Sequence, residues 1–275
     1  MFASIDWPNL ATLAISLGLA GAMAGVLAGL FGIGGGAVLV PVLIEFLRFQ
    51  GVSPDVLTHV AIGTSLAIIV PTSIRSFRSH LARGAPDTAL LKRWSLWVPL
   101  GVIVASLLVA DISGNALKII FGVVILLVAV KMLANRKDWS LSNELPRPVA
   151  TNGVGFGIGF ISALMGIGGG NLNNMFMTSF GRPIHQAVAT SAGLGMLIAI
   201  PGVLGYVYAG WGNPALPDFS LGYVSLIAVA LIMPTSLLCA PLGVRIAHGL
   251  SKRQMEIAFG VFLIIVAARM FWTAL

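Results

Sequence analysis

The chain has few charged residues and a single cysteine. Lys and Arg (16) together with Asp and Glu (9) make up only 9% of 275 residues, whereas 57% are hydrophobic. A soluble domain has about a quarter charged residues, and its helices need a polar face. Cys239 has no second cysteine for an intramolecular disulfide and is expected to be a packing residue. The composition predicts a membrane protein.

Carboxylates are missing from the middle of the apolar segments, since Glu45, Asp111 and Glu256 all lie near segment ends. A buried carboxylate is typical of cation pumps, so its absence weighs against cation transport. Catalytic motifs such as a nucleophile elbow, a phosphate loop or a zinc-binding helix are also missing. We therefore expect no enzymatic activity, no metal site and no cofactor. The net charge of +7 comes from basic residues scattered over short connections, which does not indicate nucleic-acid binding.

Ten apolar segments predict an all-α polytopic membrane protein. They lie near residues 10–31, 36–47, 57–77, 95–111 and 115–134 in the first half, and near 149–166, 171–180, 186–209, 221–240 and 255–273 in the second. A full span needs about 20 apolar residues. The second segment of each half is shorter, which predicts either a partial helix or one arm of a re-entrant hairpin. The first segment follows residues 1–9, which contain no Lys or Arg, so we expect a mature helix and no cleaved signal peptide.

The two halves repeat one pattern. Gly32-Ile33-Gly34-Gly35-Gly36 recurs as Gly166-Ile167-Gly168-Gly169-Gly170, and Phe121-Gly122-Val123 recurs as Phe259-Gly260-Val261. We predict a first repeat over 1–134, a cytoplasmic linker over 135–148 and a second repeat over 149–275. Five segments per repeat invert the second copy, so the repeats are expected to be related by a pseudo-twofold axis in the membrane plane.

Charge predicts the orientation, because cytoplasmic connections are enriched in Lys and Arg. If the N-terminus is outside, the inside connections hold Arg75, Arg78, Arg83, Lys92, Arg93, Lys131, Arg136, Lys137, Arg147, Arg182, Arg245, Lys252 and Arg253. Only Arg48, Lys118 and Arg269 are then outside. We expect a multi-pass protein of the plasma (cell inner) membrane with both termini outside. The sequence carries no signal for an oligomeric state.

The duplicated glycine pentapeptide is the strongest local signal. Such a run costs about 1 kcal/mol per residue relative to alanine in a helix, so each copy should break the chain and start a new helix. The free amides at that start, together with the helix dipole, attract anions without a formal charge. Close packing of helices is the alternative role, which the four-residue spacing of Gly21, Gly25 and Gly29, and of Gly153 and Gly157, already indicates.

Polar residues follow these breaks. Asn171 is expected to cap the new helix, while Asn173 or Asn174 reaches the substrate or a neighbouring helix. The hydroxyls of two Thr-Ser pairs can donate to an oxyanion or bond back to the preceding turn. The candidate substrate-binding residues are Gly34, Gly35, Gly36, Gly168, Gly169, Gly170, Asn171, Asn173, Asn174, Thr64, Ser65, Thr190 and Ser191. His59 and His185 precede the pairs by five residues, and proton coupling is one role open to them.

On these motifs the chain resembles the sulfite exporter TauE/SafE family of membrane permeases. The resemblance rests on the two glycine motifs, the Thr-Ser pairs at 64–65 and 190–191, and the Phe-Gly-Val segments at 121 and 259. It implies a repeat-built helical core that moves sulfite, organosulfonates or related anions. The chain departs from symmetry after the motifs, because an apolar run with Pro41 follows the first copy and an Asn-rich run follows the second.

Three functions follow from these observations. The favoured one is a secondary transporter of a small sulfur-containing anion, with alternating access around a midplane site formed by the two breaks. An anion channel would use the same helix dipoles but needs a continuous water-filled path. A membrane scaffold without transport is the third. The expected partners are the small anion and the lipid bilayer.

Overall fold

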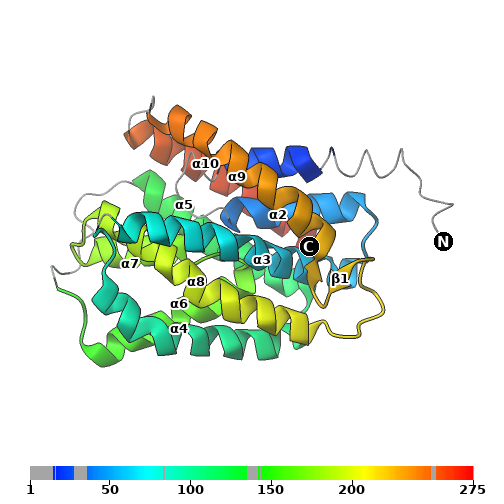
Figure 1. The fold of residues 1–275 in the computed structure, drawn as a ribbon, viewed down its shortest axis with the longest axis horizontal. Coiled ribbons are helices and arrows are strands. Elements are labelled where there is room, and N and C mark those ends of the chain that lie inside the picture. The colour runs from blue at the N-terminus through cyan, green and yellow to red at the C-terminus, as the bar shows by residue number, and fades with distance from the viewer. Residues whose placement is uncertain are drawn as a thin grey trace.

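The computed structural model describes residues 15, 17–27, 36–82, 84–134, 142, 144–248 and 252–274. Gly34 and Gly35 lie outside the described residues. The described helices are Leu17–Leu27, α2 (Gly36–Phe49), α3 (Pro54–Leu81), α4 (Thr88–Leu108), α5 (Gly114–Ala134), α6 (Pro148–Met165), α7 (Gly170–Ser179), α8 (Ile184–Ala209), α9 (Leu226–His248) and α10 (Lys252–Ala274). They form a bundle of long helices (Figure 1).

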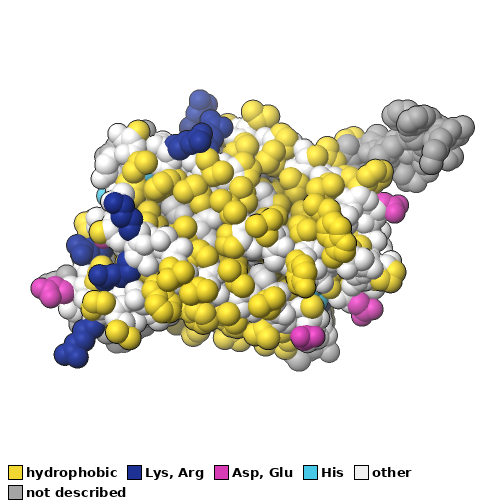
Figure 2. Space-filling view, turned by 60° about the horizontal axis from the view of Figure 1, so that its bottom comes forward, with side chains coloured by type: hydrophobic (Ala, Val, Ile, Leu, Met, Phe, Trp, Pro, Cys, Tyr) yellow, Lys and Arg dark blue, Asp and Glu magenta, His cyan; other side chains and the backbone are white. Residues whose placement is uncertain are grey.

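Seven of the described helices are long and apolar enough to cross a membrane. Their outer faces carry large exposed hydrophobic side chains, such as Leu127, Leu204 and Ile265. Figure 2 shows hydrophobic side chains over the middle of the molecule, with most visible Lys and Arg at one end and most Asp and Glu at the other. The prediction of an all-α, multi-pass membrane protein is therefore confirmed. Below, the two ends are called the basic end and the acidic end.

Helix boundaries differ from the apolar segments where polar residues begin a helix. The segment predicted from residue 95 starts at Thr88, because the Asp87 side chain accepts a hydrogen bond from Leu90 N and caps α4. The segment predicted from residue 221 begins later than expected, at Leu226, and the helix continues to His248. A two-stranded hairpin, β1 (Ser220–Leu221) and β2 (Val224–Ser225), turns at Gly222 with φ of 53° before α9 begins.

Helices of the two halves pair with each other. Across α3 and α8, a Cβ added to Gly195 would lie 3.0 Å from Ser73 Cβ, and one added to Gly202 would lie 2.9 Å from Leu66 Cδ1. These two helices therefore run antiparallel. Helices α5 and α10 are also antiparallel, since Lys118 at the start of α5 donates to Thr273 O at the end of α10.

Glycines that match between the halves have matching neighbours in the other half. Gly21 and Gly25 lie against the backbone of α9, with Ser236 Cα 2.7 Å from a Cβ added to Gly25. In the second half, Gly155 lies against the Trp94 side chain of α4, and Gly159 against the α4 backbone, with Val98 Cα 3.1 Å from a Cβ added to Gly159. Small residues allow such close helix contacts in a membrane. Gly21 and Gly25 thus have the expected packing role, but the same prediction for Gly153 and Gly157 is wrong, because nothing lies within 4 Å of a Cβ added to either of them.

The short helix α7 extends through only part of the bundle. Its ten residues correspond to about 15 Å at 1.5 Å per residue. Its C-terminal Ser179 contacts Lys131 near the end of α5. The preceding helix α6 begins at the same end, where Trp94 Nε1 of α4 donates to Thr151 O. Helices α6 and α7 therefore form a hairpin that enters and leaves at the basic end, as the re-entrant alternative predicts.

Candidate functional site

The two interrupted segments meet inside the bundle. Helix α2 begins at Gly36, and a Cβ added there would lie 2.7 Å from Ile167 Cα and 3.0 Å from Gly166 O. Gly166 ends α6 with φ of 67° and Gly169 precedes α7 with φ of 71°. Glycine adopts this left-handed region without the steric cost of other residues. The second glycine motif thus makes two backbone turns next to the start of α2.

The start of α7 lies near the middle of the bundle. A Cβ added to Gly169 would contact Ile198 Cδ1 at 2.6 Å and Leu194 Cδ2 at 3.1 Å, both close to the centre of the 26-residue helix α8. The N-cap is Gly169, and no side chain caps it. The prediction that Asn171 caps this helix is therefore wrong, because Asn171 is already its second residue.

Uncapped amides give this helix start an affinity for negative charge. The first intrahelical bond of α7 is donated by Asn173 N to Gly169 O at 2.9 Å. The N–H groups of the residues before it have no acceptor within the helix. With the helix dipole they carry partial positive charge at membrane depth. Gly168 and Gly170 are partly accessible there, whereas Asn171 is buried.

An amide and hydroxyl cluster joins α7 to α8. Asn173 is fully buried, and its Nδ2 donates to Ala187 O at 3.1 Å and to Ser191 Oγ at 2.8 Å. Ser191 Oγ lies 2.9 Å from Asn174 Oδ1, to which it donates, and also within reach of Ala187 O and Gly170 O. This cluster brings three of the predicted site residues together beside the start of α7. Asn173 Oδ1 has no hydrogen-bond partner among the described residues.

The Thr-Ser pairs contact the other half of the chain. Thr64 Oγ1 accepts from Ser225 N at 3.0 Å, directly before α9. Thr190 Oγ1 accepts from Asp87 N at 2.9 Å, directly before α4. Ser65 Oγ donates to Gly166 O of the second glycine motif at 2.8 Å. Back-bonding, the alternative role, occurs in the second pair, where Thr190 also donates to Gln186 O.

The two histidines lie away from this cluster and at opposite ends of the molecule. His59, near the start of α3, is buried, stacks on Tyr223 and has its Nε2 at 3.1 Å from Val109 O and 3.0 Å from Ile112 O. It lines a hollow of 380 Å³ at the acidic end, together with Asp55 and Asp111. His185 is exposed near the start of α8, at the basic end. Their proton-coupling role stays a prediction.

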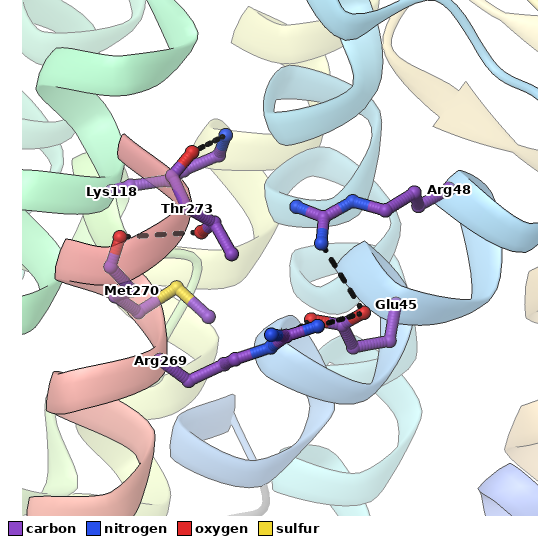
Figure 3. A network of polar contacts seen from close by, with 6 residues as sticks. All are labelled: Glu45, Arg48, Lys118, Arg269, Met270 and Thr273. Carbon is purple, nitrogen blue, oxygen red and sulfur yellow. Dashed lines mark hydrogen bonds and ion pairs between the residues drawn. The ribbon is translucent and has the colours of Figure 1, made fainter. Parts of the chain in front are cut away.

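Sequence reasoning missed a pair of anchors on the short helices. Lys131 Nζ of α5 donates to Met175 O at 3.2 Å and to Ser179 Oγ at 3.0 Å in α7. At the matching position of α10, Arg269 forms two hydrogen bonds to Glu45 of α2, at 2.8 and 3.1 Å (Figure 3). Position 269 follows 131 by the same 138 residues that separate the Phe-Gly-Val motifs. This equal spacing could have identified Lys131 and Arg269 in the sequence as equivalent residues of the two halves.

We expect Lys131→Met to lower the free energy of unfolding by about 1 to 2 kcal/mol, because two hydrogen bonds from a charged group to α7 are lost. Thermal or denaturant unfolding in detergent measures this change. Lys92→Met is the control, since exposed Lys92 makes no side-chain hydrogen bond within the described part of the chain. Equal stability of Lys131→Met and the wild type would contradict the anchoring role.

The chain matches the model of a known protein family. The family model for the sulfite exporter TauE/SafE matches residues 17–270, which is nearly the whole chain. The chain belongs to the TauE/SafE family. This confirms the resemblance inferred from the glycine motifs and the Thr-Ser pairs.

Curated relatives in this family are described as membrane transporters. A "Probable membrane transporter protein" of Haemophilus influenzae is 37% identical over 92% of this chain and 96% of its own length. A protein of Methanocaldococcus jannaschii with a similar description is 29% identical over 89% of this chain and 90% of its own. No solved structure matches the chain significantly. Together with the apolar helices, the family establishes a multi-pass membrane transporter.

Proposed function

We propose that the chain is a secondary transporter of a small sulfur-containing anion, such as sulfite or an organosulfonate, working by alternating access. The observation that carries this proposal is the start of α7, where an uncapped helix begins near the middle of the bundle beside the Gly36–Ile167 contact. Free amides at membrane depth suit an anion that has to be bound and then released. The family description, sulfite exporter, supports the substrate class.

The proposed binding surface consists of Gly168, Gly169, Gly170 and Asn171 at the start of α7, with Asn174 and Ser191 beside it. Gly34 and Gly35 belong to the proposal through the repeat, because they precede Gly36 as Gly168 and Gly169 precede Gly170. Thr64, Ser65 and Thr190 donate or accept in contacts between the halves. We propose that they hold the halves in register around the bound anion.

Inverted repeats are part of the proposal. The antiparallel course of α3 and α8, and of α5 and α10, is expected when two copies of one fold are related by an axis in the membrane plane. The contacts of Thr64 and Thr190 fit the same relation, because each threonine accepts a hydrogen bond from a backbone N–H of the other half, Ser225 N for Thr64 and Asp87 N for Thr190. The first repeat is then 1–134 and the second 149–275, joined by the linker 135–148.

Alternating access requires the closely packed contact at the centre to open. Gly36 lies against Gly166 and Ile167 without room for a methyl group. We propose that the two halves rock against each other and separate these backbones, so that the site opens first to one face of the membrane and then to the opposite face. We propose that the basic end faces the cytoplasm and that both termini lie outside the plasma membrane, because cytoplasmic connections are enriched in Lys and Arg.

Purified protein in liposomes is expected to show saturable flux of sulfite or an organosulfonate. Saturation is expected because each cycle moves the anion bound at one site, and unitary currents are not expected because no continuous pore opens. Flux of labelled anion and electrical recording measure both properties. Absence of flux for sulfite, sulfate, thiosulfate, taurine and sulfoacetate would contradict the substrate class, whereas unitary currents would contradict alternating access.

A further inference from the structure

Three cations gather at the acidic end around one carboxylate. Arg48 of α2 and Arg269 of α10 contact Glu45, and Lys118 of α5 lies beyond them with its Nζ bonded to Thr273 O, as Figure 3 shows. Arg269 binds Glu45 through two hydrogen bonds, and Arg48 Nη1 lies 3.5 Å from Glu45 Oε2. Lys118 interacts electrostatically with both Arg48 and Glu45. Three positive charges against one negative charge leave the cluster with an excess of two among the described residues.

Lys118 is the most unusual member of this cluster. Its side chain is buried, yet among the described residues its Nζ donates only to neutral groups, Asn115 Oδ1 at 3.3 Å and Thr273 O at 3.1 Å. An ammonium group has three donors, and burial of its charge is costly unless an anion lies nearby. Arg48 and Arg269 are accessible, with 40% and 49% of their side chains exposed. The cluster is therefore open to an anion from outside the protein.

The surroundings of the cluster place it at the level of lipid headgroups. Trp272 is 81% exposed three residues after Arg269, and Phe49 is 76% exposed next to Arg48. Exposed Trp side chains are enriched at the membrane–water interface. Ile265, one helical turn before Arg269 on the same face, is also exposed and apolar. The outer face of α10 thus changes from a lipid-facing surface to a cationic one within one turn.

We propose that Arg48, Lys118 and Arg269 form a binding site for the phosphate group of an anionic phospholipid. The guanidinium groups supply charge-assisted hydrogen bonds to phosphate oxygens, and Lys118 supplies a point charge behind them. Glu45 balances one cation and keeps α2 joined to α10. Because α2 runs from this cluster to Gly36 at the central contact, the bound lipid stabilises the position of that helix.

The test compares lipid binding to purified variants in neutral detergent. Binding of phosphatidylglycerol and of phosphatidylcholine with the same acyl chains is measured by native mass spectrometry and by thermal stabilisation. We expect the wild type to prefer phosphatidylglycerol. Arg48→Gln should weaken that preference about fivefold, and Arg48→Gln with Lys118→Gln about 25-fold, since each basic residue near an anionic headgroup contributes a similar amount. Both variants retain the Glu45–Arg269 ion pair.

The matched control is Lys92→Gln with Arg93→Gln, which removes the same charge from exposed residues at the basic end. Equal loss in both double variants would overturn the site, because net charge alone would then explain it. If inorganic phosphate in excess stabilises the wild type as phosphatidylglycerol does, the site takes a free oxyanion and the lipid assignment is overturned. If the double variant does not fold, Arg48→Gln alone decides, since its side chain is exposed.

Discussion

Gly169→Leu is expected to abolish anion flux, and Gly169→Ala to reduce it at least tenfold. Gly169 has φ of 71°, where a non-glycine residue costs about 1 to 2 kcal/mol. A Cβ would also lie 2.6 Å from Ile198 Cδ1. Both substitutions therefore displace the start of α7 from α8. Flux into liposomes and anion-dependent thermal stabilisation measure the two consequences.

Gly157→Ala is the matched control for this prediction. Gly157 is inside helix α6, and nothing lies within 4 Å of a Cβ added there. Alanine in a helix interior is about 1 kcal/mol more favourable than glycine, so this variant should be slightly more stable and transport normally. Wild-type flux in both Gly169 variants would mean that the binding site lies elsewhere.

Asn171→Asp is expected to abolish stabilisation by sulfite or a sulfonate. The substitution keeps the shape of the side chain and adds a negative charge in the first turn of α7. Attraction to the helix start offsets about 0.3 to 1 kcal/mol of the cost of burying this charge, and the carboxylate repels the anion from the amides that the proposed substrate uses. Thermal unfolding with and without the anion measures this loss.

Asn115→Asp is the control, because Asn115 is the second residue of α5 as Asn171 is of α7. Its carboxylate should stabilise the helix start and strengthen the contact with Lys118, but it should leave the anion effect intact. Asn171→Leu, which adds no charge, separates loss of the amide from repulsion. Stabilisation by sulfite that persists unchanged in both Asn171 variants would contradict the proposed site.

The sequence predicted the membrane class and most helices because hydropathy depends on composition over about 20 residues. It misplaced the starts of α4 and α9 because Lys92 and Arg93 interrupt the apolar pattern of α4, and because the β1–β2 hairpin before α9 is itself apolar. Whether the short segments span could not be predicted from length alone. The contact of Lys131 with Ser179 resolves it for α7, because both ends of the α6–α7 hairpin lie at one end of the bundle.

The candidate site was predictable in its backbone and less so in its side chains. Duplicated glycines indicated the two breaks, because a run of glycines cannot continue an unstrained helix. The partners of the polar residues depend on which helices pack together, and a single half does not contain that information. Thr64 illustrates this, since its partner Ser225 N lies 161 residues away.

The hydrogen bonds between the two halves, which Thr64 and Thr190 accept, also affect how the protein is made. When a nascent chain has inserted only its first half, Thr64 and the glycine-facing surface of α4 still lack the partners that Ser225 and α6 later supply. The unfinished half therefore exposes polar and small-residue surfaces to lipid until translation continues. Each half therefore supplies hydrogen-bond partners and packing surfaces that the other half lacks.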